Sequence, residues 1–193
     1  EDGEVILIDA GAEFRGYAAD ITRSWPINGK FTEAQKEIYQ LVLDAQYAAI
    51  DCCRVGQAYT APHDAARKVL AEGLIQLGIS NQSLEEALDL ETGDLRKWYM
   101  HNTSHWIGLD VHDVGIYKPN GEPRLLEEGM CLTIEPGLYF GAWRPDVDCP
   151  ERYANLGIRI EDDVLVTSGD PDVLTSACPK TIEEIESITG KAF

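Results

Sequence analysis

Three of the four histidines of this chain lie within twelve consecutive positions, at His101, His105 and His112. Their spacings of four and seven would place the three side chains on one face of a helix. Gly108 and Gly115 lie in the same segment, HNTSHWIGLDVHDVG, and they favour a strand-and-turn ribbon over a helix. The alternative is that each imidazole makes ordinary hydrogen bonds at a partly exposed position. The clustering favours a shared site, so we look for polar partners elsewhere in the chain.

Composition limits the partners of such a site. A length of 193 residues, 44% of them hydrophobic, is typical of a single globular domain. The formal net charge of −18 argues against binding to nucleic acid or to an anionic membrane surface. The sequence has no run of about 18 apolar residues that could span a membrane. Five cysteines without a C-x-x-C motif indicate a reducing compartment, so we expect a cytoplasmic protein.

The beginning of the chain supplies two carboxylates. It opens without an initiator methionine or a signal-like segment, so we expect that an N-terminal portion is missing from it. The apolar stretch Val5–Ile8 predicts a buried strand that delivers Asp9, and a second extended stretch carries Asp20. A hairpin centred between Phe14 and Arg15 would place the two aspartates opposite each other, with Cβ atoms roughly 5 Å apart. Such a pair requires a cation or a shared proton, unless Asp9 caps a turn and Asp20 faces solvent.

Helices should cover the sheet that these strands begin. Capping boxes, apolar stripes and stop signals predict helices from Thr32 to before Gly56, from about Ala61 to Leu77, and from Thr181 through Ile188. The polar segment from Ser83 to Trp98 predicts one or two short helices or a loop. His63, at the start of the second long helix, is expected to be a surface residue without a role.

Two later strands carry further acidic residues. Met130–Ile134 predicts a buried strand that ends in Glu135, directly before a Pro-Gly break. A glutamate in that position is either a turn residue or a ligand presented by a rigid edge. In the last predicted strand, residues 156–166, the alternation of side chains places Arg159 and Glu161 on one face.

Five of these residues follow one another in a specific order: Asp9, Asp20, His105, Glu135 and Glu161. Their contexts are D-A-G, A-D-I-T-R, S-H-W-I-G-L-D-V-H-D-V-G, T-I-E-P-G-L-Y and G-I-R-I-E-D-D. Over essentially the whole chain, this series resembles the pita-bread metallopeptidases, and within them the aminopeptidase P (Xaa-Pro aminopeptidase) family. The resemblance implies an α+β pita-bread fold, with a curved antiparallel sheet covered by helices. It also implies that residues 1–193 are the C-terminal catalytic domain, without the domain's own first part and the N-terminal domain before it.

The resemblance further implies two divalent metal ions, with Asp9 on one, Asp20 and Glu161 bridging both, and His105 and Glu135 completing the other. Four carboxylates and one imidazole form a hard, oxygen-rich ligand set, for which we expect Mn²⁺, with Co²⁺ or Zn²⁺ as alternatives. A hydroxide shared by the ions would attack the peptide bond between an N-terminal residue and a following proline.

The same resemblance implies roles for the surrounding side chains. Glu135 would also shuttle a proton, and His101 and His112 would contact the substrate and the reaction intermediate. Arg159 would support Asp9 through an ion pair without touching a metal ion. Tyr139 is a candidate for lining the substrate site, with a core tyrosine as the alternative.

Related activities are the main alternatives. The interval of 26 residues from Glu135 to Glu161 is shorter than in the prolidases, which cleave Xaa-Pro dipeptides and remain the alternative enzyme. The context of His105 favours aminopeptidase P over methionine aminopeptidase. A binding module that has lost its ligands, or a metal-free enzyme such as creatinase, is disfavoured because all five ligand types are present. The expected partners are peptides with proline at the second position, the N-terminal portion, and further copies in a homo-oligomer.

Overall fold

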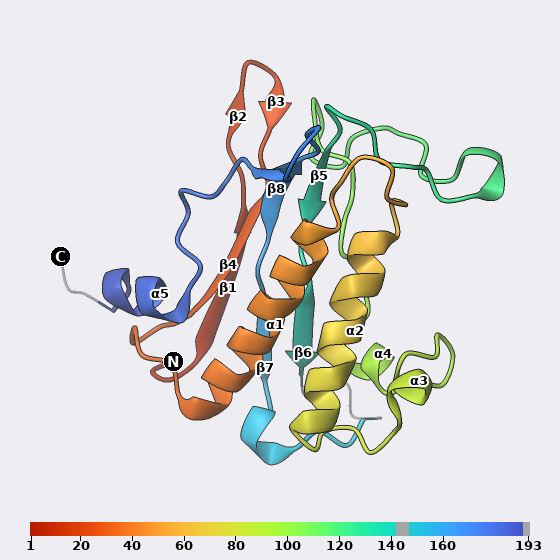
Figure 1. The fold of residues 1–193 in the computed structure, drawn as a ribbon. Helices are drawn as coiled ribbons and strands as arrows, with labels where there is room; N and C mark the ends of the chain where they lie inside the picture. The colour runs from red at the N-terminus through yellow and green to blue at the C-terminus, as the bar shows by residue number, and fades with distance from the viewer. Residues whose placement is uncertain (142–146, 191–193) are drawn as a thin grey trace.

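The computed structural model describes residues 1–141 and 147–190. Its strands are β1 (Val5–Ala10), β2 (Glu13–Phe14), β3 (Tyr17–Ala18), β4 (Ile21–Pro26), β5 (Cys131–Ile134), β6 (Gly137–Phe140), β7 (Leu156–Arg159), β8 (Asp162–Leu165) and β9 (Asp172–Val173). Its helices are α1 (Glu33–Asp51), α2 (Ala61–Gln76), α3 (Leu84–Ala87), α4 (Leu95–Trp98) and α5 (Ile182–Ile188), with 3₁₀ turns at Pro119–Gly121 and Glu151–Tyr153. The strand pairs of the described residues are antiparallel. In Figure 1, α1 and α2 lie side by side across one face of the strands, which is the predicted α+β arrangement.

The N-terminal hairpin differs in register from the prediction. Its turn is formed by Arg15 and Gly16, whose φ values of 55° and 87° match a two-residue turn with both central residues at positive φ. Strand β1 therefore pairs with β4 so that Asp9 lies opposite Thr22, and the prediction that Asp9 lies opposite Asp20 was wrong. The shift equals two residues, which is one period of the strand, so Asp20 remains a diagonal neighbour on the same face.

The last predicted strand is divided into two. Strand β7 pairs with β6 and strand β8 pairs with β5, and the division falls at Ile160 and Glu161. The segment that pairs with it is divided as well, because Pro136 lies between β5 and β6. Strand β4 runs beside this junction, because the amide of Glu161 donates to the carbonyl of Thr22 over 3.0 Å. The ends of several strands thus meet where Glu161 lies.

The helices form as their local signals predict. Helix α1 begins with a capping box between Thr32 and Gln35, and α5 begins with one between Thr181 and Glu184. The polar segment 83–98 contains two short helices, α3 and α4, as one of the two predictions for it stated. The apolar stripe of α1, including Ile38 and Val42, packs into a core with fully buried residues of α2 and the strands, among them Leu70, Leu132 and Ile158. Within the described residues, no helix is both long and apolar enough to cross a bilayer.

Candidate metal centre

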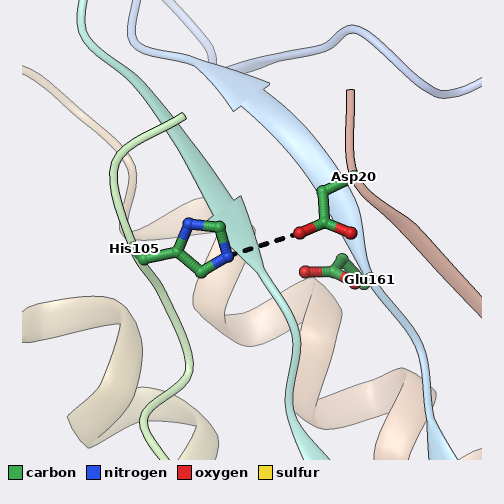
Figure 2. A group of neighbouring side chains, drawn as sticks. All are labelled: Asp20, His105 and Glu161. Atoms are coloured by element: carbon green, nitrogen blue, oxygen red, sulfur yellow. Dashed lines mark ion pairs between the residues drawn. The ribbon is translucent and has the colours of Figure 1, made fainter. Parts of the chain in front are cut away.

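Three side chains from distant segments converge on one site. Asp20, His105 and Glu161 offer ligand atoms that all lie within 4.8 Å of one another. Figure 2 shows the three side chains pointing toward one another. His105 Nε2 lies 3.4 Å from Oδ2 of Asp20 and 3.6 Å from Oε1 of Glu135. Asp20 directly precedes β4, Glu161 lies at the junction of β7 and β8, and Glu135 directly follows β5. The fold therefore brings together four of the five predicted ligands, and Asp9 joins them through contacts described below.

The histidine ribbon, residues 101–115, delivers His105 to this site. It is not helical, and it runs beside β5 without forming a regular strand. The amide of Thr133 donates to the carbonyl of His105 over 3.0 Å, and the amide of Glu135 donates to the carbonyl of Thr103 over 2.8 Å. These bonds align the ribbon with β5, so that an imidazole and a carboxylate reach the same space. The preference against a helix is confirmed, whereas the strand of the predicted strand-and-turn ribbon is reduced to one isolated bridge between Trp106 and Leu132.

The orientation of His105 indicates what the site requires. Its Nδ1 lies 3.0 Å from the carbonyl oxygen of Trp106, and because a carbonyl only accepts, Nδ1 carries the hydrogen. Burial lowers the pKa of His105, so near pH 7 the ring is neutral and Nε2 keeps its lone pair. That lone pair faces oxygens of Asp20 and Glu135, which also only accept when they are ionised. A cation satisfies all three acceptors, and a metal-binding histidine commonly donates its other N–H to a carbonyl in this way.

The pKa values of the carboxyl groups lead to the same requirement. Burial, followed by the charge of Glu135, raises the pKa of Glu161 to about 9. Burial raises the pKa of Glu135 to about 7 although Arg159 opposes the shift, and burial together with contact to Asp9 raises the pKa of Asp20 to about 7. Ionising these groups together costs free energy unless a cation is present. Carboxylates with a single imidazole are ligands that hard divalent cations prefer, so the residues fit the expected metal ions.

Arg159 connects Asp9 to the other ligands. Its Nη2 lies 2.5 Å from Oδ2 of Asp9, so the predicted ion pair is present. Its Nε donates to the hydroxyl of Thr22 over 3.1 Å, and that hydroxyl donates to Oε2 of Glu161 over 2.6 Å. Thr22 is fully buried, and it was not among the predicted site residues. The correct hairpin register would have found it, because Thr22 lies opposite Asp9 and shares its face.

A cavity of about 410 Å³ opens over these groups, lined by Asp9, Asp20, His101, Asn102, Ser104, His105, His112, Glu135, Arg159 and Glu161. The five predicted ligands and both further histidines of the ribbon thus face one space. The ring of His112 packs edge-on against that of His105, with centroids 4.4 Å apart. Tyr139 contacts this set from the side, because its hydroxyl lies 2.7 Å from Nε2 of His101 and accepts from Arg159 over 3.4 Å.

His63 is partly buried, so the expectation of a surface position was wrong. Its Nδ1 lies 2.8 Å from the hydroxyl of Thr103, and its ring packs against that of Tyr99. Burial lowers the pKa of His63 to about 4. Since the carbonyl of Thr103 also holds the amide of Glu135, His63 supports the histidine ribbon beside the site. No local signal pairs residues 40 positions apart, so this contact could not be read from the sequence.

Buried carboxylates and one imidazole, brought together between helices and an antiparallel sheet, have the ligand types of a divalent-metal centre. The sequence pattern of Metallopeptidase family M24 matches residues 1–168, and the chain belongs to this family. The predicted family and its α+β pita-bread fold are thereby confirmed.

Similar proteins point to one branch of the family. The chain is 44% identical over 187 residues to the Xaa-Pro aminopeptidase of Escherichia coli K12, covering 97% of this chain and 41% of that protein. It is 39% identical over 191 residues to Xaa-Pro aminopeptidase 3 of Rattus norvegicus, covering 99% of this chain and 36% of that protein. The structure of Pseudomonas aeruginosa aminopeptidase PepP superposes with a TM-score of 0.91 at 45% identity, covering 97% of this chain and 41% of that one.

A variant of Escherichia coli aminopeptidase P in complex with substrate superposes with a TM-score of 0.88 at 44% identity, covering 96% of this chain and 41% of that one. The chain thus spans about two fifths of the length of these relatives.

Proposed function

We propose that this protein is a metal-dependent aminopeptidase that releases the N-terminal residue in front of proline from Xaa-Pro-Xaa peptides. The observation that carries the proposal is the convergence of Asp20, His105 and Glu161, with the lone pair of the imidazole facing carboxylate oxygens. The relatives that match nearly the whole chain at 44% identity are Xaa-Pro aminopeptidases, which supports this substrate class.

In this proposal the five predicted ligands hold two divalent ions. The residues that would hold them all line one cavity: Asp9, Asp20, His105, Glu135 and Glu161. Four carboxylates then balance the charge of two divalent cations, which removes the electrostatic cost that raises their pKa values. When bound, such ions supply Lewis acidity and activate water for hydrolysis. We expect Mn²⁺, with Co²⁺ or Zn²⁺ as alternatives.

Glu135 is placed to move a proton during the reaction. Its carboxylate can accept a proton and release it again when it lies within reach of the reacting groups. Its carboxylate lies 3.6 Å from Nε2 of His105 and lines the same cavity as His101 and His112. A proton taken up by Glu135 can therefore reach the leaving nitrogen of a substrate in that cavity.

His101 and Tyr139 act as one unit in the proposal. Nδ1 of His101 donates to the carbonyl of Asn102 over 2.7 Å, so Nε2 accepts the hydroxyl hydrogen of Tyr139 over 2.7 Å. Arg159 donates to that hydroxyl in turn. His101 and His112 contact the substrate from two sides of the cavity, while Tyr139 keeps the ring of His101 in place.

The test combines metal analysis with cleavage of three peptide classes: Xaa-Pro-Xaa, Xaa-Pro and Met-Xaa. The protein loaded with Mn²⁺ should cleave Ala-Pro-Ala faster than Ala-Pro and should not require an N-terminal methionine. A dipeptide should be the poorer substrate, because its free carboxylate falls where a neutral peptide group is expected. Preference for Ala-Pro would establish prolidase activity instead. Metal binding without cleavage of any peptide would favour a binding module.

Three further predictions concern the protein as a whole. Assignment of residues 1–193 to a C-terminal catalytic domain, assembly into a homo-oligomer and a cytoplasmic location are proposed from the sequence. Size-exclusion chromatography with light scattering and localisation of a tagged protein would test the last two.

A further inference from the structure

A second cavity, of about 680 Å³, lies between the first turns of α2 and the segment that contains α4. The basic residues that line it are His63, Arg67, Arg96, Lys97 and His101. In the described part of the chain, no lining residue carries a carboxylate. The whole chain, by contrast, has 34 acidic and 16 basic residues, so a basic cavity is a local reversal of its charge.

The basic cavity adjoins the candidate metal centre. His101 and Asn102 line both cavities, so a chain that passes them extends from one space into the other. The ring of His101 packs in T-shaped contacts with the rings of Tyr99 and Tyr139, with centroids 5.0 Å and 5.4 Å away. A peptide held at the metal centre that continues past His101 therefore enters the basic cavity.

The cations of this cavity have donors left for a ligand. Arg67 uses one guanidinium nitrogen to donate to the carbonyl of Leu88, and Arg96 uses one to donate to the carbonyl of Glu91. A guanidinium carries five N–H donors, so each arginine keeps several. Lys97 contacts Asp94 over 2.6 Å at its exposed position. The bonds to neighbouring carbonyls hold both arginines in place at the cavity, where a carboxylate can accept from them.

We propose that the basic cavity binds a carboxylate of the substrate downstream of the proline, supplied either by the C-terminus of a short peptide or by an acidic side chain. The proposal rests on the proposed function, since it assigns the cavity to the departing part of the same peptide. A competing interpretation is that the three cations only fasten the segment 88–97 to α2. The two interpretations make different predictions, because only the first expects the charge of the peptide to change its binding.

Four peptides test the proposal on the intact protein loaded with Mn²⁺: Ala-Pro-Ala-Ala, its C-terminal amide, Ala-Pro-Glu-Ala-amide and Ala-Pro-Lys-Ala-amide. The free acid and the glutamate peptide should have KM values roughly threefold to tenfold below that of the lysine peptide, as expected for one or two partly exposed ion pairs. The difference should shrink in 0.5 M NaCl, because salt screens such pairs. The free acid and the glutamate peptide separate the two sources of the carboxylate.

The double variant carries Arg96→Glu and Lys97→Glu. It should remove or reverse the preference for negatively charged peptides, while kcat for the neutral amide stays within about twofold. The matched control is Lys30→Glu with Lys36→Glu, which makes the same charge change at exposed lysines that line neither cavity. Equal KM values for all four peptides in the unaltered protein, or loss of the preference in the control, would overturn the proposal. Calorimetric binding of the same peptides to the unaltered protein in the presence of a chelator keeps the result independent of turnover and of the metal centre, so failure of cleavage and failure of the cavity assignment are distinguishable.

Discussion

Glu161 and Asp162 are neighbours in the chain and are both almost completely buried, yet their carboxylates have opposite surroundings. The carboxylate of Asp162 accepts four hydrogen bonds of 2.7–3.1 Å, two of them from cations, and its partners are Arg23, Gln46, Thr175 and Lys180. Glu161 accepts from the hydroxyl of Thr22, and the charges of Glu135, Asp20 and Asp9 raise its pKa further after burial has done so.

The difference shows how one extended segment serves structure on one face and chemistry on the other. Successive side chains of an extended segment point to opposite faces, so Glu161, directly before β8, and Asp162, its first residue, separate. The fold supplies its own cations to Asp162, and thereby ties the segment before α5 to the sheet. Around Glu161, by contrast, the fold places more carboxylates than cations. A buried charge with internal partners is structural, whereas a buried charge without them calls for an external cation.

The largest expected effect distinguishes the two neighbours by function. Glu161→Gln keeps the shape of the side chain and removes a ligand charge, so bound metal and turnover should fall together, turnover by about 10³-fold. The unfolding free energy in the presence of a chelator should not decrease, because a carboxylate with a raised pKa is removed. Metal analysis, peptide turnover and urea unfolding measure the three quantities. Two retained metal ions with full turnover would reject the ligand assignment.

Asp162→Asn should instead lower the stability of the fold, because it leaves Arg23 and Lys180 buried without a counter-charge. We expect a loss of roughly 3 kcal/mol in unfolding free energy by urea titration, the lower end for a broken buried ion pair. The control is Asp170→Asn, whose exposed carboxylate contacts Arg54 at the surface and whose loss should leave stability unchanged. A stable Asp162→Asn protein would mean that the internal cations do not depend on this carboxylate.

The pH dependence of the chelated protein sharpens the comparison. Because the folded pKa of Glu161 is about 9, against an ordinary value of 4.5, the folded state holds a proton that the unfolded state has lost. Stability must therefore fall as the pH rises between these values, by about 2 kcal/mol from pH 6.5 to 8.5. Denaturant titrations at the two pH values measure the change. Saturating Mn²⁺ should abolish the fall. Glu161→Gln should remove the larger part of it and leave the smaller contribution of Asp20 and Glu135, whose raised pKa values lie near 7; an undiminished fall in that variant would place its origin elsewhere.

The smallest expected effect concerns the hydroxyl that orients Glu161. Thr22→Val keeps the shape and removes the bond to Glu161 and the acceptor for Arg159, so metal affinity should fall about tenfold, as for other residues that orient a ligand. Calorimetric titration with Mn²⁺ measures it. Thr22→Ser keeps a hydroxyl and should restore most of the affinity. Equal affinities for all three proteins would show that Thr22 only fills space.

Much of the local structure and the members of the site were readable from the sequence. Capping boxes at Thr32 and Thr181 predicted the starts of α1 and α5, because the signal lies within four residues. The alternation of the last strand placed Glu161 on the face of Arg159, since that pattern depends only on the period of a strand. The register of the N-terminal hairpin was missed, because Arg15 adopts a positive φ that its residue type does not announce.

The sequence by itself determined which residue types could form a metal centre and on which elements they lie, because ligand chemistry and strand periodicity are local properties. Only the tertiary structure decided which charges are compensated: Asp162 receives cations from β4 and from the segment before α5, whereas Glu161 meets other carboxylates. It also decided that His63 supports the histidine ribbon and that a basic cavity adjoins the metal centre. Burial and distance between remote segments set these electrostatic outcomes, and neither quantity is contained in any local pattern of the chain.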